Sequence, residues 1–586
     1  MRLHDSVAPL IAATAICAVI AVAAYLRALS GTFVWDDTVL ADGSGIGGGS
    51  SLAACFRTAF LDHFYRPLVS FSFYLDRLLW PENARAYHWV NIILHAAGTV
   101  FVVLLAAQLL RDTGKAAIAG VLFATHPVHL GATAWIGGRT DTLGTLWTAI
   151  FALGLVAAAH RTGNGRSSWL ALSVVAYTLA LFTKEQTLFL LPLIPLTFAV
   201  LKPDRGVAPP ADGWFATAPF LVAAVFYLSV GAFPGMPGPA AMGATTLEQA
   251  ENFLLACRAY AELLFLPTQR SLFAYSLEPW RAGAPWSWLW GGGVVVAVLG
   301  SLLISWSRNK TVAWAIAFCV LSILPVSNFL PMPFLLFAHY RAAVAGIGFA
   351  CLLAEMLGGL RWSALRPAQA PAAAGAAVLT AWYVVHVLLA IPAYRNEETL
   401  FRNIISYDST SVVARYMLAR LCMNSGRPDE AALHLEKTLD YLYGTTLWRH
   451  REAAVRMIDS QREVQVRVRQ NQGLRQDPRL FLVTLFKHLG YARMHAGQIV
   501  QAREAFRTAL KWEPDQAECL HGLAWCDARL GNFEEARQTL LKVLAKEATP
   551  QRYQLMAQVL EHLGQPLEAR TYWRLSQQPV SNTPHQ

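Results

Sequence analysis

Long apolar stretches separated by short polar segments fill the first two thirds of the chain. The first, at residues 7–28, is apolar over about 20 positions, enough to span a bilayer. Ten more follow, at 88–110, 116–135, 142–160, 168–182, 187–201, 214–233, 287–306, 311–330, 336–357 and 373–393. None shows the alternation of a β-strand, and a backbone in lipid must satisfy its own hydrogen bonds. The pattern therefore predicts about eleven membrane-spanning helices, with residues 7–28 retained as the first.

Another apolar stretch, at 252–267, is ambiguous because it is short and carries Arg258 and Glu262. A charge at mid-bilayer costs roughly 2.5 kcal/mol or more. If this stretch does not span, short loops with two basic residues each alternate along the chain, and the positive-inside rule places them in the cytoplasm. We therefore expect eleven spans with the N-terminus inside. The long loop 29–87 and the chain after residue 393 are then expected on the outer face.

The pattern changes near residue 393. Beyond it, a glycine turn followed by a small alanine recurs, at Gly426, Gly497, Gly531 and Gly564. The last three turns are 34 and 33 residues apart, the period of the tetratricopeptide repeat. We predict an α-solenoid of about four to five helical hairpins over 394–586, irregular at 444–478. Such repeats form a concave surface for peptides or partner proteins, and a purely structural cap is the alternative.

The distribution of charge supports this division. The first 393 residues hold 39 charged side chains and the last 193 hold 47, whereas a soluble chain is about 25% charged. An ordinary soluble globule is therefore excluded. We expect an all-α protein with a multispanning membrane domain at 1–393 and a repeat domain at 394–586. The net charge of +10 is divided evenly between the two parts without a basic run, so no nucleic-acid partner is expected.

Two adjacent carboxylates, Asp36 and Asp37, follow the first predicted helix directly after Trp35. One carboxylate can accept a proton from a hydroxyl group while the other orients a substrate or a cation. Taken alone, the pair is more typical of a solvated loop. Other polar residues are expected on the same outer face and could line one site with Trp35, namely His126, His129, Asp141, Glu185 and His339.

Four basic residues on this face could hold a phosphate or pyrophosphate, namely Arg66, Arg139, Lys184 and Arg341. Each alone is more typical of an interfacial anchor or an ion-pair partner, but their convergence favours a shared function. His126 and His129 have a spacing that can hold a metal, yet no Glu accompanies them, so we predict no metal site. The chain has no Walker-type or GxGxxG loop, so no nucleotide site is expected.

The motifs occur in a fixed order, and several further segments accompany them. In sequence they read Phe33-Val34-Trp35-Asp36-Asp37, Tyr65-Arg66-Pro67-Leu68, His126-Pro127-Val128-His129, Arg139-Thr140-Asp141, Lys184-Glu185, Leu324-Pro325-Val326-Ser327-Asn328 and Glu397-Glu398-Thr399-Leu400-Phe401. This order resembles the transmembrane and tetratricopeptide-repeat-containing family of O-mannosyltransferases and its bacterial relatives. That family lies within the GT-C glycosyltransferase superfamily.

The resemblance implies a glycosyltransferase whose sugar donor is linked to a polyprenyl phosphate and is bound from the non-cytoplasmic leaflet. It implies inverting transfer to a protein hydroxyl, with Asp36 as the base and Asp37 as its helper. Basic residues of the outer face would hold the lipid phosphate, and the repeats would present the acceptor. The sequence identifies no certain cofactor, and a divalent cation is an open option. Abundant Ala, Arg and Gly suggest a bacterial inner membrane, with the repeats in the periplasm.

The chain departs from the family pattern at two places. The acidic residue that usually follows the second His of the HPxH motif is missing from Leu130-Gly131-Ala132, and an acidic–basic pair is replaced in His339-Tyr340-Arg341. An inactive membrane scaffold that uses its repeats for protein assembly is therefore the alternative. A transporter of lipid-linked saccharides is less favoured, because the membrane part shows no convincing internal symmetry.

Overall fold

The computed structural model describes most of the chain. The described residues are 4–46, 51–61, 64–201, 213–231, 246–274, 277–281, 286–330, 337–358, 370–443 and 478–577. They are helical apart from turns, loops and one isolated bridge between Phe60 and Phe64. The chain forms two compact units, Met1–Ser409 and Thr410–Gln586, which are described separately. The all-α prediction is confirmed for the described residues.

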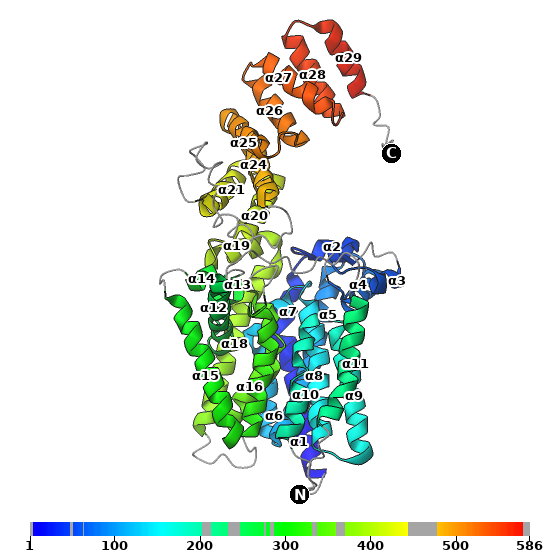
Figure 1. Cartoon of the computed structure of the whole chain (residues 1–586), viewed down its shortest axis with the longest axis vertical. Helices are drawn as coiled ribbons and strands as arrows, with labels where there is room; N and C mark the ends of the chain where they lie inside the picture. Colours follow the sequence, from blue (N-terminus) through cyan, green and yellow to red (C-terminus); the bar gives the residue numbers. More distant parts are fainter. Residues whose placement is uncertain are drawn as a thin grey trace. The chain divides into compact units, whose positions relative to one another are not determined.

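The first unit is a bundle of helices, most of them long (Figure 1). They are α1 (His4–Tyr25), α5 (Ala84–Leu110), α6 (Thr113–Thr125), α8 (Arg139–Ala159), α9 (Gly163–Leu181), α10 (Leu193–Val200), α11 (Gly213–Gly231), α12 (Thr246–Phe265), α15 (Ser287–Arg308), α16 (Lys310–Ile323), α17 (Ala345–Leu357) and α18 (Ala370–Ala390). Helix α8 is almost entirely buried and packs against α5 and α9, so it forms the centre of the bundle.

Several of these helices could cross a membrane. Within the described residues, five are long and apolar enough: Val7–Ser30, Ala84–Leu110, Arg139–Ala159, Ser287–Arg308 and Ala374–Arg395. A sixth span results if Thr113–Thr125 and Pro127–Ala134, bent by 45°, count as one. The prediction of a polytopic membrane domain is thus confirmed in its coarser form, and the count of eleven stays a prediction. The ambiguous stretch 252–267 lies largely in α12, which packs against α15.

Short elements gather at the end of the first unit opposite the N-terminus. Figure 1 shows there α2 (Asp37–Asp42), α3 (Leu52–Arg57), α4 (Pro67–Leu79), α13 (Gln269–Phe273), α14 (Glu278–Arg281) and α19 (Glu397–Tyr407). A small apolar core that includes Leu40, Phe73 and Ile136 joins the loop 29–87 to the turn after α7 (Leu130–Ala134). Burial of this core holds the loop that carries the two adjacent carboxylates.

The second unit consists of helical hairpins. Its helices are α20 (Val412–Asn424), α21 (Pro428–Tyr443), α24 (Pro478–His495), α25 (Ile499–Trp512), α26 (Ala517–Arg529), α27 (Phe533–Leu544), α28 (Pro550–His562) and α29 (Pro566–Ser576). The four predicted turn glycines each join two helices, and all have a positive φ between 70° and 83°. Glycine adopts this conformation without the penalty that a side chain imposes. The expected irregular stretch 444–478 falls almost wholly outside the described residues.

Candidate active site

The loop before α2 holds the two adjacent carboxylates in different surroundings. Asp37 is fully buried, and its carboxylate accepts hydrogen bonds from the backbone N–H of Val34 (2.9 Å) and of Gly137 (2.7 Å). Burial raises the pKa of Asp37, and the two backbone donors oppose that rise. Asp37 therefore joins its own loop to the turn before α8, which is a structural task.

Asp36 precedes α2 and is half-buried. Its carboxylate accepts no hydrogen bond from any residue that the structure describes. Burial raises the pKa of Asp36 to about 6. A carboxylate with that pKa binds a proton more readily than an ordinary aspartate and is still largely ionised at neutral pH. Of the two carboxylates, Asp36 therefore has the properties that a general base needs.

Trp35 fixes the direction of this loop. Its φ of +55° is uncommon for a residue with a side chain. The Trp35 backbone N–H donates to Glu397 Oε1 at 3.1 Å, and its ring stacks on Trp135 with centroids 5.8 Å apart. Non-glycine residues at positive φ persist where the surrounding contacts hold them, often at functional sites. Here a carboxylate and an aromatic ring hold the residue next to Asp36.

Charged residues from separate segments converge on the side chain of Tyr340 in η6 (His339–Ala342). The phenol lies within electrostatic range of Arg341, Asp141, Asp36 and Arg66. Its ring also packs on Trp135, with centroids 5.5 Å apart. We call Asp36, Arg66, Asp141, Lys184, Glu185, Tyr340 and Arg341 the charged cluster. The structure thus brings together residues that the sequence placed only on the same face.

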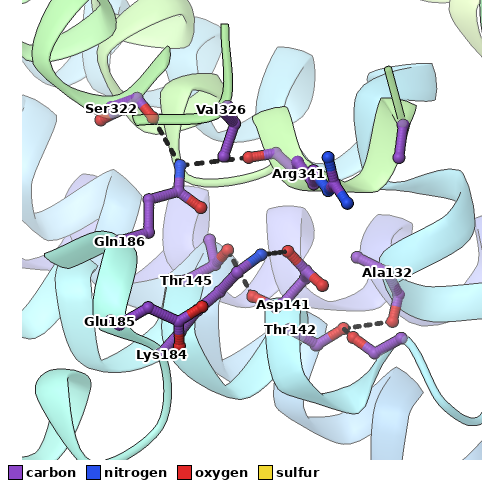
Figure 2. A network of polar contacts seen from close by, with 12 residues as sticks. Ala132, Asp141, Thr142, Thr145, Lys184, Glu185, Gln186, Ser322, Val326 and Arg341 are labelled. Atoms are coloured by element: carbon purple, nitrogen blue, oxygen red, sulfur yellow. Dashed lines mark hydrogen bonds and ion pairs between the residues drawn. The ribbon is translucent and has the colours of Figure 1, made fainter. Parts of the chain in front are cut away.

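Two predicted phosphate-binding cations of the charged cluster, Lys184 and Arg66, already have carboxylate partners. Lys184 Nζ forms an ion pair with Asp141 Oδ1, and both side chains are almost fully buried (Figure 2). Arg66 makes a two-point contact with Glu185, at 2.6 and 3.1 Å, and its guanidinium lies 3.9 Å from the Phe64 ring centroid. A donor phosphate at this place would therefore share Lys184 and Arg66 with the two carboxylates.

The turn that carries Arg341 is held by Gln186. Figure 2 shows the Gln186 amide between two backbone carbonyls, and its Nε2 donates to Ser322 O and, at 3.2 Å, to Arg341 O. Gln186 directly follows Lys184 and Glu185. One short segment, η4 (Glu185–Leu190) with Lys184 before it, therefore supplies one cation, contacts Arg66 and holds the turn. Arg341 itself is half-buried, so it is more accessible than Lys184.

Arg139, a third predicted phosphate-binding cation, also has partners within the protein. It is fully buried, and its guanidinium forms an ion pair with Asp76 and donates to Asn91 Oδ1 (2.8 Å) and Tyr87 O (2.9 Å). The guanidinium also lies 4.4 Å from the Phe73 ring centroid. Its donors are therefore used within the protein. We call Arg139, Asp76, Asn91, Tyr87 and Phe73 the Arg139 network. The donor site proposed below does not include Arg139.

The three predicted histidines are buried. His126 Nε2 contacts Leu264 O at 2.9 Å, and its Nδ1 accepts from the backbone N–H of Val128 at 3.0 Å. The His129 ring packs 4.2 Å from that of Phe123, and His339 Nε2 lies 3.2 Å from the Tyr394 hydroxyl. Among the residues the structure describes, no group of three or more His, Cys, Asp or Glu side chains could hold a metal ion.

Several residues of this region were not among the site residues expected from the sequence. Tyr340 stands between two expected site residues, so its position in the motif was the available signal. Glu397 begins a segment that carried the family resemblance, yet nothing in the sequence pointed to its contact with Trp35. Asp76 and Asn91 had no sequence signal beyond being polar within otherwise apolar segments. Their roles depend on packing between distant elements.

The comparisons with known proteins agree with both parts of the chain. Residues 493–559 match a family model described as "Tetratricopeptide repeat", which confirms the predicted repeats. The chain is 37% identical over 136 residues to "Protein O-mannosyl-transferase Tmtc1" of Drosophila melanogaster, a match covering 21% of this chain and 16% of that protein. This chain is therefore similar to the TMTC protein O-mannosyl-transferases. The resemblance predicted from the motifs is confirmed.

Two longer matches support this similarity. "Protein O-mannosyl-transferase F38B6.6" of Caenorhabditis elegans is 33% identical over 182 residues, covering 29% of this chain and 25% of that protein. Human "Protein O-mannosyl-transferase TMTC3" is 27% identical over 334 residues, covering 50% of this chain and 35% of that protein. The chain thus matches well under two thirds of the length of these TMTC relatives. Together with the apolar helices, the similarity indicates a membrane protein.

Proposed function

We propose that this chain is a membrane glycosyltransferase that moves a sugar from a polyprenyl-phosphate-linked donor to a hydroxyl group of a protein. The observation that carries the proposal is that Asp36, a carboxylate with a raised pKa, interacts with the same side chain, Tyr340, as the cations Arg341 and Arg66. A base and cations grouped around one residue suit a reaction that removes a proton from one substrate and releases a phosphate from the other. The names of the relatives support mannose as the first sugar to test.

The reaction we propose is a single inverting displacement. The acceptor oxygen attacks C1 of the sugar, and its proton passes to the Asp36 carboxylate. The bond between C1 and the donor phosphate oxygen breaks, and its electron pair leaves with the polyprenyl phosphate. Arg341, Lys184 and Arg66 stabilise the charge on that phosphate, which we expect to be the main electrostatic contribution to catalysis. Asp37 acts indirectly, because it holds the loop that carries Asp36.

The proposed site lies on the non-cytoplasmic face of a bacterial inner membrane. In this arrangement the chain has eleven spans, the N-terminus is cytoplasmic, and residues 394–586 are periplasmic. The gathering of α2, α4 and α19 at the end of the first unit opposite the N-terminus supports the proposal (Figure 1). Protease added to the periplasmic side of oriented vesicles should cleave within residues 394–586. Cleavage from the cytoplasmic side alone would reverse the topology.

The repeats are proposed to select or present the protein acceptor, because stacked helical hairpins offer an extended surface to a peptide. The alternative is a scaffold without transferase activity that uses the repeats for assembly. The two places where this chain departs from the family pattern, Gly131 and His339, both lie near the charged cluster. The two proposals differ in one measurable property, namely whether the protein transfers a sugar at all.

The experiment is reconstitution of the full-length protein with mannosyl-phosphoryl-polyprenol and a peptide rich in serine and threonine. We expect the appearance of mannosylated peptide and free polyprenyl phosphate in equal amounts. Parallel reactions with a chelator and with glucosyl donors test for a divalent cation and for sugar preference. Failure to transfer from any polyprenyl-phosphate sugar would reject the proposed function in favour of the scaffold.

A further inference from the structure

His339 and Gly131, the two places where the chain departs from the family pattern, are in direct contact. His339 is fully buried, and its ring lies against the backbone of Gly131 in α7. A Cβ atom on residue 131 would lie 2.9 Å from His339 Cε1 and 3.1 Å from Cδ2, and closer still to Nε2. Buried rings do not tolerate such overlap without moving. The position of the imidazole therefore depends on the absence of a side chain at residue 131.

The same imidazole connects η6 to the loop that carries the proposed base. His339 Nε2 lies 3.2 Å from the hydroxyl of Tyr394, in η8 (Ile391–Arg395). The next carbonyl, Arg395 O, accepts hydrogen bonds from the backbone N–H of Thr32 at 2.9 Å and from its hydroxyl at 3.1 Å. Thr32 lies four residues before Asp36. A short chain of contacts thus runs from residue 131 to the base loop.

The turn η6 also carries one of the three cations of the proposed donor site. Arg341 follows His339 by two residues, and its carbonyl is held on the other side by Gln186 at 3.2 Å. The turn is therefore fixed at two points, Gln186 and the contact between Gly131 and His339. A shift of the imidazole would move Tyr340 and Arg341 relative to Asp36, because all three belong to segments tied by these contacts.

We propose that Gly131 and His339 are positioning residues that act as one unit, setting the position of Arg341 relative to Asp36. The inference rests on the proposed function of the same site. It assigns a common purpose to the two departures from the family pattern. The small residue at 131 makes room for the imidazole, and the imidazole in turn contacts the hydroxyl of Tyr394.

The test is a double-mutant cycle on the full-length protein, with mannosyl-phosphoryl-polyprenol as the donor. Gly131→Ala should raise the KM for this donor about tenfold, with a smaller change in the KM for the peptide, because Arg341 is displaced. His339→Ala removes the overlap. The double variant Gly131→Ala/His339→Ala should therefore have a lower donor KM than Gly131→Ala alone. Independent effects that multiply in the double variant would overturn the inference.

The matched control is Gly120→Ala in α6. A Cβ there would lie 2.8 Å from Cys17 Sγ and would also overlap Val103, so the packing defect is comparable but involves no residue of the charged cluster. We expect a lower melting temperature with an unchanged donor KM. An equal rise of the donor KM in Gly120→Ala would show that general loosening explains the effect, and would overturn the inference.

Binding of the donor lipid separates this inference from the proposed function. If the unaltered protein binds mannosyl-phosphoryl-polyprenol but transfers nothing, the proposed function fails and the cycle is measured on the Kd instead. A Gly131→Ala defect that His339→Ala relieves would then still support the positioning role. A Kd that neither variant changes would reject that role, whatever the outcome for transfer.

Discussion

Two groups of charges lie near the same end of the first unit, and they differ in how fully their charges are paired within the protein. In the Arg139 network, the guanidinium donates to Asp76, Asn91 and a backbone carbonyl, and aromatic rings cover it. In the charged cluster, Asp36 accepts no hydrogen bond from the residues that the structure describes. The Glu185 partner of Arg66 is also partly exposed.

The comparison shows that a buried arginine is no sign of a substrate site by itself. A charge whose hydrogen bonds are all made inside the protein contributes to stability, since removing its partner leaves an uncompensated buried charge. A charge with unused capacity at a partly exposed place can instead bind a substrate. The two groups should therefore respond to substitution in opposite ways, one in folding and the other in transfer.

The largest expected effect is on folding and comes from the Arg139 network. Arg139→Met leaves the Asp76 carboxylate buried without its partner, which should lower the free energy of unfolding by about 3–5 kcal/mol. The measurement is thermal unfolding in detergent, together with the yield of monodisperse protein. A well-folded Arg139→Met protein whose only defect is a weaker affinity for the donor would place Arg139 in the donor site and cancel the comparison.

Arg341→Met should instead impair donor binding. Loss of a charge-assisted contact to phosphate should raise the KM for the donor about tenfold or more, while the melting temperature stays close to that of the unaltered protein. Arg308→Met, at the end of α15 and away from the cluster, is the control and should leave the donor KM unchanged. Equal donor KM values for Arg341→Met and Arg308→Met would show that Arg341 does not bind the donor phosphate.

The pH dependence of transfer tests the unused capacity of Asp36. Because burial raises the pKa of Asp36 to about 6, this group is protonated below that pH and cannot accept the hydroxyl proton. The ratio kcat/KM should fall about tenfold per pH unit well below pH 6 and level off above it. Arg341→Met should keep the same inflection. A profile that is flat between about pH 5 and 7 would contradict the role of Asp36.

The smallest effect is expected for an exposed ion pair in the same unit. Arg402 and Glu398 form an i,i+4 pair on α19, with side chains 43% and 37% exposed. Arg402→Met should cost only about 0.3–0.5 kcal/mol and should not change transfer. Thermal unfolding measures the first and the mannosylation assay the second. A stability loss as large as that of Arg139→Met would mean that burial does not explain why the Arg139 network and this exposed pair contribute differently to stability.

The sequence predicted much of the fold because its signals were local. Apolar stretches of spanning length gave the long helices, and the glycines at 426, 497, 531 and 564 gave the hairpin turns. The partners within the site were not predictable in this way. The pairing of Lys184 with Asp141, the burial of Arg139 against Asp76, and the contact of His339 with Gly131 all join distant segments. Motifs placed these residues on one face but could not say which charges neutralise one another.

The most direct test of the account compares sugar transfer by three proteins. In Asp36→Asn the base is lost. Asp42→Asn instead removes the exposed carboxylate at the end of α2, which accepts hydrogen bonds from the backbone N–H and hydroxyl of Ser44 and interacts with Arg77. We predict that Asp36→Asn lowers kcat by about 10²- to 10⁴-fold at unchanged melting temperature, and that Asp42→Asn transfers mannose like the unaltered protein. Unimpaired transfer by a correctly folded Asp36→Asn protein would contradict the central claim.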